Sequence, residues 1–491
     1  MTETPATPTA DTPEYRQQLL GGPQKVALLV GVAGAIAFAV LGAAIAATTG
    51  DDAVRDHEAP APAQQLLLSY LTGFSVWVSI GIGSVFFLLV QYVTGGRWGI
   101  LLRRPLEANA KTLVLGLVLF VPVVVSMFMG ENSIYWWARH AAHHQHDDHG
   151  TAEPAGKAEA KQDQAPKEGE KAEPGKAAPK GTAKTEPKPD ASHGKAWKQS
   201  NVKPVLPHDE EEKIHDWLFP SFTAVRGFLY LGIFIGLAYW MRWNAMKAEY
   251  ETDLVIAARY RDRQKYVGSF GLFAFAITLT LAATDWWMSL EETFASSMFP
   301  VIAFDNAALT AYCVGILTLL YFKRNGDSRF INLFPATEQI HLGSLMLAFT
   351  LAWTYFNFSQ YMLIWVGNLA EEIPYYIKRT TQGWEYYAIL AVIIHFPIPF
   401  LLLLFRRVKS NPTALRNIAI MLLCICFVDV MWWIQPSHSH WGAPKFYWLL
   451  DVSAWVMVGG FWVAYFLGAL KKHPLLPTRE VYLLEEYHHG H

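Results

Sequence analysis

Charged residues are scarce in this sequence. Of its 491 residues, 17% are Asp, Glu, Lys or Arg, whereas an average globular protein has about 25%. The formal net charge is −2, so the chain has no basic excess with which to bind nucleic acid. Hydrophobic residues make up 52% of the sequence and are concentrated in long runs. This composition excludes a conventional soluble enzyme and predicts a polytopic membrane protein.

Cysteine is also scarce. The sequence has three, Cys313, Cys424 and Cys426, and all lie within apolar runs. Three thiols cannot supply the four thiolates of an iron–sulfur cluster, and the haem-attachment pattern C-x-x-C-H is missing. Two histidines, His341 and His395, fall within apolar runs, but at different depths, which argues against a haem held by two histidines. We therefore expect no redox cofactor and no metal ion on this chain.

Ten apolar runs are long enough to cross a bilayer as helices, which takes about 20 residues each. They cover residues 25–47, 67–93, 112–130, 221–241, 266–288, 301–322, 341–366, 384–405, 415–435 and 449–470. The predicted fold class is an all-α integral membrane protein with about ten transmembrane helices. The chain then divides into an N-terminal segment (1–24), spans 1–3 (25–130), an insertion (131–220), spans 4–10 (221–470) and a tail (471–491).

The basic residues of the short loops predict the orientation of these spans. Lys and Arg are frequent in the loops after spans 2, 4, 6 and 8 and rare in those after spans 1, 5, 7 and 9. Because loops rich in Lys and Arg stay on the cytoplasmic side, we expect both termini to be cytoplasmic.

The insertion at 131–220 falls on the outer side in this scheme. Its Ala, Lys, Glu, Pro and Gly repeats lack the apolar residues of a core, so disorder is expected. It begins with a histidine tract whose spacing fits no closed tetrahedral metal site, which favours a solvated loop: His140, His143, His144, His146 and His149.

Ionisable residues within membrane spans are costly and usually functional, so they are the candidate site residues. They are spread over several spans, as a proton route through a helix bundle requires. The candidates for proton transfer are Arg226, Asp285, Glu291, Asp305, Glu338, His341, His395 and Asp429.

Structural roles compete with proton transfer at each of these positions. Asp305 opens its span, where a carboxylate suits the helix dipole. Asp285 and Asp429 are flanked by tryptophans of an interfacial belt and can simply pair with an arginine such as Arg226. His395 is as readily a satisfied core histidine as a proton carrier.

Three segments of the second half resemble the NrfD/PsrC-like membrane subunits of respiratory complexes: LAATDWWMSLEETFASSMFP (281–300), LMLAFTLAWTYFNFSQYMLIWVGNLAEEIPYYIKR (345–379) and FVDVMWWIQPSHSH (427–440). The pattern F-S-Q-x-x-x-I-W-x-x-N-x-x-E-E, from Phe358 to Glu372, is the most specific part. The sequence of these segments is most similar to the ActF type of subunit. ActF is one of two paralogous ten-span subunits of alternative complex III, a bacterial quinol-oxidising complex.

This resemblance implies two four-helix bundles, spans 2–5 and spans 6–9, with spans 1 and 10 alongside. It implies a bacterial inner-membrane subunit without catalytic residues or a redox cofactor, which scaffolds the complex. Proton conduction is a separate hypothesis, based on the ionisable residues spread over its spans. The implied partners are membrane lipids, a paralogous ten-span subunit, an iron–sulfur subunit, and multihaem and monohaem cytochrome c subunits. These subunits carry the iron–sulfur clusters and c-type haems, with quinone as a possible ligand. Three alternatives stay open: quinol oxidation by this chain, an independent proton or ion transporter, and a pure anchor.

Overall fold

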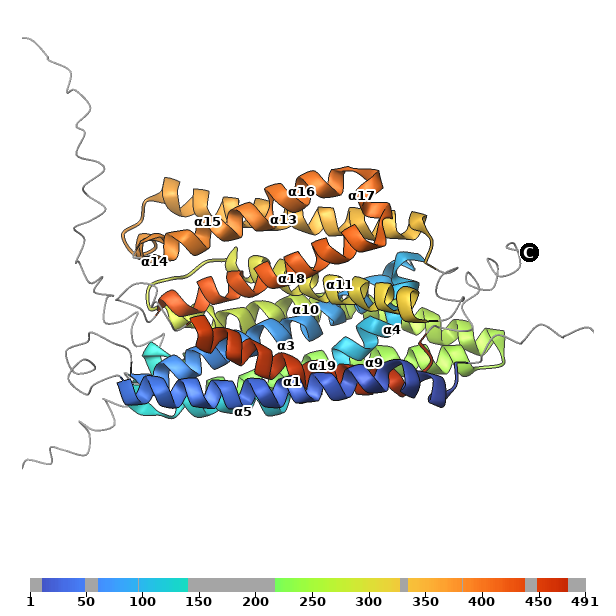
Figure 1. The fold of residues 1–491 in the computed structure, drawn as a ribbon, viewed down its shortest axis with the longest axis horizontal. Coiled ribbons are helices and arrows are strands. Elements are labelled where there is room, and N and C mark those ends of the chain that lie inside the picture. The colour runs from blue at the N-terminus through green and yellow to red at the C-terminus, as the bar shows by residue number, and fades with distance from the viewer. Residues whose placement is uncertain are drawn as a thin grey trace, which may run out of the picture.

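The computed structural model describes residues 11–48, 61–95, 97–139, 217–326, 334–381, 383–437 and 448–475, and every regular element among them is helical. The long helices lie side by side with their axes roughly parallel (Figure 1). Residues 140–216 of the insertion, with its histidine tract, and residues 476–491 of the tail lie outside the described residues.

Nine helical stretches of the described residues are long and apolar enough to cross a membrane. They comprise α1 (Pro13–Thr48), α3 (Pro62–Thr94), α4 (Arg97–Lys111) with α5 (Leu113–Met127), α9 (Pro220–Tyr250), α10 (Leu254–Trp286), α11 (Phe299–Asn325), α15 (Trp384–His395) with α16 (Pro397–Leu404), α18 (Pro412–Ile434) and α19 (Trp448–Lys471). This confirms the expected fold class, an all-α multi-pass membrane protein.

The remaining predicted span, 341–366, corresponds to α13 (Ala336–Gly367). This helix is long enough to cross a bilayer, at about 48 Å, and lies alongside α11 (Figure 1). Asn357, Ser359 and Gln360 interrupt its apolar sequence, and it is not among the nine apolar stretches.

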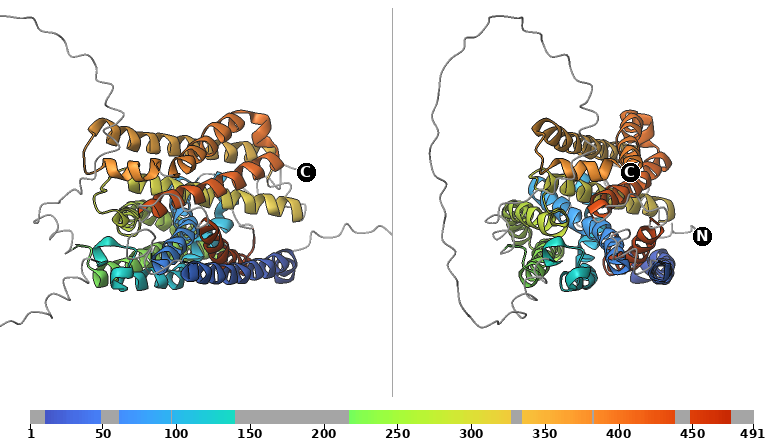
Figure 2. Two further views of the ribbon diagram at one scale, coloured as in Figure 1. Left: turned by 60° about the vertical axis from the view of Figure 1, so that its left-hand side comes forward. Right: turned by 90° about the vertical axis from the view of Figure 1, so that its left-hand side faces the viewer.

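The contacts between helices group them as the resemblance implies. Helices α3, α4 with α5, α9 and α10 pack together, and α11, α13, α15 with α16, and α18 form the second group. Helix α3 is buried along most of its length and also contacts α11, α18 and α19. Helix α1 packs on α19 beside the bundles, as the end-on view shows (Figure 2).

Glycines allow the closest of these helix contacts. A Cβ atom at Gly34 would lie 2.6 Å from the backbone nitrogen of Met457, so α1 and α19 meet backbone to backbone. A Cβ at Gly83 of α3 would collide with the carbonyl oxygen of Ala307 on α11. Small residues give this close approach in membranes, where lipid provides no hydrophobic force between helices.

Residues 97–111 differ from the sequence-based expectation. They were predicted as a cytoplasmic loop before a third span at 112–130, but they form helix α4, which packs against α3, α9, α11 and α19. Its Arg103 and Arg104 are buried, because Glu107 of the same helix pairs with both. A local hydropathy window misses such a helix, since its charges are neutralised only by folding.

Helices α9 and α10 are longer than the predicted spans 221–241 and 266–288. Helix α9 continues to Tyr250 and α10 begins at Leu254, so the predicted basic loop is mostly helical. The side chain of Asp253 caps α10 by accepting hydrogen bonds from the amides of Val255 and Ile256.

Two irregular points shape the second bundle. Helix α15 ends at His395, and α16 begins at Pro397, whose ring disfavours helical backbone at Phe396. Helix α13 ends at Gly367 and is capped by Asn368, which adopts a left-handed conformation with φ of 48°. The chain then turns into α14 (Ile373–Thr380), a short amphipathic helix at this end of the bundle.

Candidate functional site

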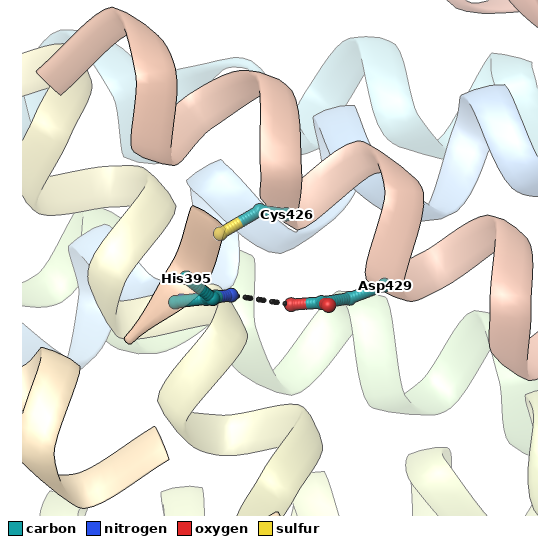
Figure 3. A group of neighbouring side chains, drawn as sticks. All are labelled: His395, Cys426 and Asp429. Atoms are coloured by element: carbon teal, nitrogen blue, oxygen red, sulfur yellow. Dashed lines mark ion pairs between the residues drawn. The ribbon is translucent and has the colours of Figure 1, made fainter. Parts of the chain in front are cut away.

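Three helices of the second bundle bring His395, Asp429 and Trp353 together. The Nδ1 atom of His395 lies 2.8 Å from Oδ2 of Asp429, and Nε1 of Trp353 donates a 3.0 Å hydrogen bond to the same oxygen. The imidazole stacks on the Trp353 indole, with ring centroids 4.0 Å apart. All three side chains are buried. Figure 3 shows the His395 and Asp429 side chains pointing toward each other.

The contact between His395 and Asp429 has an ion-pair distance but not the alignment of a hydrogen bond. Neither ring nitrogen of His395 has an aligned hydrogen-bond partner among the described residues. A buried imidazole without such partners is costly, unless water or a group that enters the site supplies the hydrogen bonds.

Cys426 adds a third donor to this cluster, one turn before Asp429 on α18 (Figure 3). The three donor atoms lie within 4.8 Å of one another. Two ligands on a tetrahedral zinc ion at about 2.1 Å would be about 3.4 Å apart. The nitrogen and oxygen of His395 and Asp429 are closer than that, at 2.8 Å. In this arrangement there is thus no room for a zinc ion between these two atoms.

Asp305 lies in the same bundle, on α11. It is the seventh residue of α11, which begins at Phe299, so it lies near the start of the helix as expected, but only 1% of its surface is exposed. Neither carboxyl oxygen has a hydrogen-bond partner among the described residues. Since an ionised carboxylate without partners is very costly in such surroundings, Asp305 is suited to hold or pass a proton.

A cavity of about 440 Å³ adjoins the pair between α13, α15 and α18. Trp353, Asp429 and Trp432 line its inner end, and Phe358, Ile389 and Val392 line it farther out. Phe358 is 60% exposed and Ile389 55% exposed, so the cavity opens to the apolar outer surface of the bundle. It is therefore an apolar chamber with a carboxylate at its inner end.

Asp285 and Arg226 form a separate ion pair in the first bundle. Nε of Arg226 donates to Oδ2 of Asp285 at 2.9 Å, and the hydroxyl of Tyr230 donates to the same oxygen at 2.8 Å. Arg226 also lies over the ring of Trp217. The arginine pairing weighed for Asp285 is thus present, whereas Asp429 meets a histidine instead.

Glu291 is anchored near the α14 end of the second bundle. It accepts hydrogen bonds from Nη1 of Arg379 at 2.8 Å and from Nζ of Lys378 at 2.7 Å. Arg379 is fully buried and also donates to the carbonyl oxygens of Trp432 and Trp433 on α18. Glu291 is therefore tied to the helix that carries Asp429.

Glu338 and His341 lie in the first two turns of α13, at the opposite end of the bundle. Glu338 is buried and His341 is exposed. The twelve residues from His341 to Trp353 correspond to about 18 Å of helix. The structure thus does not bring these two residues to the His395–Asp429 pair.

Several residues of the site had no recognisable signal in the sequence. In the sequence, Trp353 cannot be told apart from the other tryptophans of the membrane spans. Cys426 looks like an ordinary small residue of an apolar core. Arg379 was predicted only as a loop cation. Their roles depend on contacts between residues far apart in the chain, such as the 76 positions between Trp353 and Asp429.

The fold and this site define a class of protein: an all-α multi-pass membrane protein with a buried imidazole–carboxylate pair beside an apolar cavity. No protein-family model matches the chain, and no curated protein matches it.

Proposed function

We propose that this chain is an integral membrane subunit of a quinol-oxidising respiratory complex of the alternative complex III type, and that it scaffolds the complex and conducts protons. The observation that carries the proton role is the buried pair of His395 and Asp429, with Asp305 nearby in the same bundle. Ionisable groups at this depth mark proton or ion pathways in membrane proteins.

A proton route toward the α14 end would run from Asp429 to Glu291 through water, because backbone carbonyls and the permanently protonated Arg379 cannot relay a proton. Asp429 lies one turn before Trp432 and Trp433, whose carbonyl oxygens accept hydrogen bonds from Arg379. Arg379 in turn contacts Glu291, which reaches Lys378 at the partly exposed edge of the protein. Toward Glu338 and His341 the separation is longer, so conduction on that side also needs water between the helices.

The same proposal includes the location and the partners of the chain. The basic residues at the end where α3, α9 and α11 terminate favour a cytoplasmic position for that end and for both termini, in a bacterial inner membrane. The redox cofactors belong to the neighbours, namely an iron–sulfur subunit and multihaem and monohaem cytochrome c subunits. A paralogous ten-span subunit lies in the membrane.

Gentle detergent extraction through a tag on the full chain, followed by mass spectrometry, tests the assignment to a complex. We expect a multihaem cytochrome c, an iron–sulfur protein and a second ten-span subunit to be recovered with it. Recovery of this chain alone, as a monomer or homodimer, would contradict the assignment and favour an independent proton or ion transporter.

The cavity favours a second candidate function, quinol binding by this chain itself. Quinol is an apolar ring with two hydroxyl groups, and the chamber combines apolar walls, an opening toward lipid and a proton acceptor at its inner end. Oxidation of quinol releases two protons and two electrons. Asp429 and His395 would take up protons, and the electrons would pass to a cluster in the iron–sulfur partner.

A substitution that fills the cavity distinguishes quinol binding by this chain from a role in proton conduction alone. If quinol binds there, Ala388→Trp at the cavity wall should weaken binding of a quinone analogue at least tenfold, about 1.4 kcal/mol, measured by calorimetry on the purified complex. The matched control is Ala276→Trp, on an exposed part of α10, which should bind as the wild type does. Equal affinity in both variants would rule the cavity out as the quinol site.

A further inference from the structure

A second cluster of ionisable residues lies far from the His395–Asp429 pair, near the end of the protein where α3, α9 and α19 terminate. It is built from α4, the last turns of α9 and the residues after α19, and α4 packs against both α9 and α19. The proton role proposed above uses none of its residues.

Glu107 of α4 is the centre of this cluster. It accepts hydrogen bonds from Nε of Arg103 at 3.1 Å, Nη1 of Arg104 at 2.9 Å and Nη1 of Arg242 at 2.7 Å. Arg104 also donates to Glu249 of α9 at 2.6 Å. Three guanidinium groups thus meet two carboxylates, and all of these side chains are buried or nearly so.

The cluster has more positive charge and more donors than its carboxylates use. Nη2 of Arg242 and Nε of Arg104 are buried without a hydrogen-bond partner among the described residues. Lys111 and Lys472 add two further charges that act on the same group of residues. Unpaired guanidinium donors of this kind are costly unless an anion completes them.

His473, which follows α19, lies close enough to the cluster for its positive charges to lower the pKa of the imidazole. Its own burial, together with the charges of Arg242, Lys111 and Arg104, lowers the pKa of its imidazole to about 4. His473 is therefore neutral at physiological pH and does not add to the excess charge. The excess comes from the arginines and lysines alone.

We propose that this cluster binds the phosphate group of an anionic phospholipid, with Arg242, Lys111 and Lys472 facing the headgroup. The chemistry is that of a phosphate monoanion held by guanidinium and ammonium donors, and arginine suits its planar, two-oxygen recognition. A lipid is favoured over a free ion because the cluster lies between the ends of membrane helices. Basic pockets in this position bind acidic headgroups.

The test measures phospholipid retained by the full chain after purification in mild detergent. Native mass spectrometry should detect bound phosphatidylglycerol when the protein is exchanged into micelles containing it, and no equivalent adduct with phosphatidylcholine. Arg242→Gln should reduce the bound fraction about tenfold, as expected for loss of one charge-assisted contact to phosphate. Lys111→Gln serves as a second variant, because Lys111 forms none of the close ion pairs described above for this cluster.

The matched control is Arg261→Gln, an exposed arginine on α10 near the same end of the protein. It should retain phosphatidylglycerol as the wild type does. Competition by millimolar inorganic phosphate would identify a site for the phosphate group alone, whereas resistance to it would identify the lipid as the ligand. Equal binding of both lipids, or unchanged binding in Arg242→Gln and Lys111→Gln together, would overturn the proposal.

Discussion

Replacing Asp429 with asparagine should lower proton-coupled quinol turnover of the intact complex at least 100-fold, the lower end of what a positioned acid or base contributes. Asparagine keeps an oxygen that can accept the Trp353 Nε1–H bond and has nearly the same volume, so packing is preserved. It cannot exchange a proton with His395. The measurement is quinol oxidation in proteoliposomes, with external pH followed at the same time.

Further variants test whether the loss of turnover depends on the His395–Asp429 pair. His395→Gln should reproduce the loss, because it removes the other member of the pair, whereas Glu371→Gln, an exposed carboxylate after α13, should have no effect. Asp285→Asn examines the first bundle in the same assay. Normal turnover with a normal proton-to-electron ratio in both Asp429→Asn and Asp285→Asn would contradict proton conduction and leave a purely structural anchor.

The largest effect on stability is expected at Arg379. Its guanidinium is fully buried, donates to Glu291 and to two carbonyl groups of α18, and lies 3.6 Å from the centroid of the Tyr375 ring. Arg379→Met leaves the buried carboxylate of Glu291 without this partner. Breaking a buried pair in this way costs about 3–5 kcal/mol. Unfolding of the full chain in mixed micelles should show this as a lower free energy of unfolding.

Lys378 offers a close control for this change. It pairs with the other oxygen of the same carboxylate at 2.7 Å, but 32% of its side chain is exposed. Because water screens and replaces an exposed ion pair, Lys378→Met should cost less than about 1 kcal/mol. Similar losses in the two variants would mean that burial of Arg379 is not the reason for its effect.

The membrane spans were predictable because a spanning helix is specified locally. A run of about 20 apolar residues is sufficient, and the structure differs from the prediction mainly where charged side chains are paired in the folded protein. Arg103 and Arg104 illustrate this point. Read alone, they indicate a loop, but Glu107 and Glu249 of the folded protein allow them to lie inside a buried helix.

The candidate site was predictable in part. Intramembrane charge pointed to Asp429, His395 and Asp285 as residues of interest, because each is too costly to keep at that depth without a reason. The sequence did not show that Asp429 meets His395 and Trp353 while Asp285 meets Arg226. Nor did it show that Asp305, near the start of its helix, is buried without a hydrogen-bond partner among the described residues.

The sequence by itself determined that this is an all-α membrane protein with about ten spans, since hydropathy acts over one helix at a time. Only the tertiary structure decided which buried groups share a site. That choice depends on how α13, α15 and α18 pack, and the packing joins Trp353, His395 and Asp429 from distant parts of the chain. Side-chain pairing between helices is a property of their relative rotation and depth, which no single helix encodes.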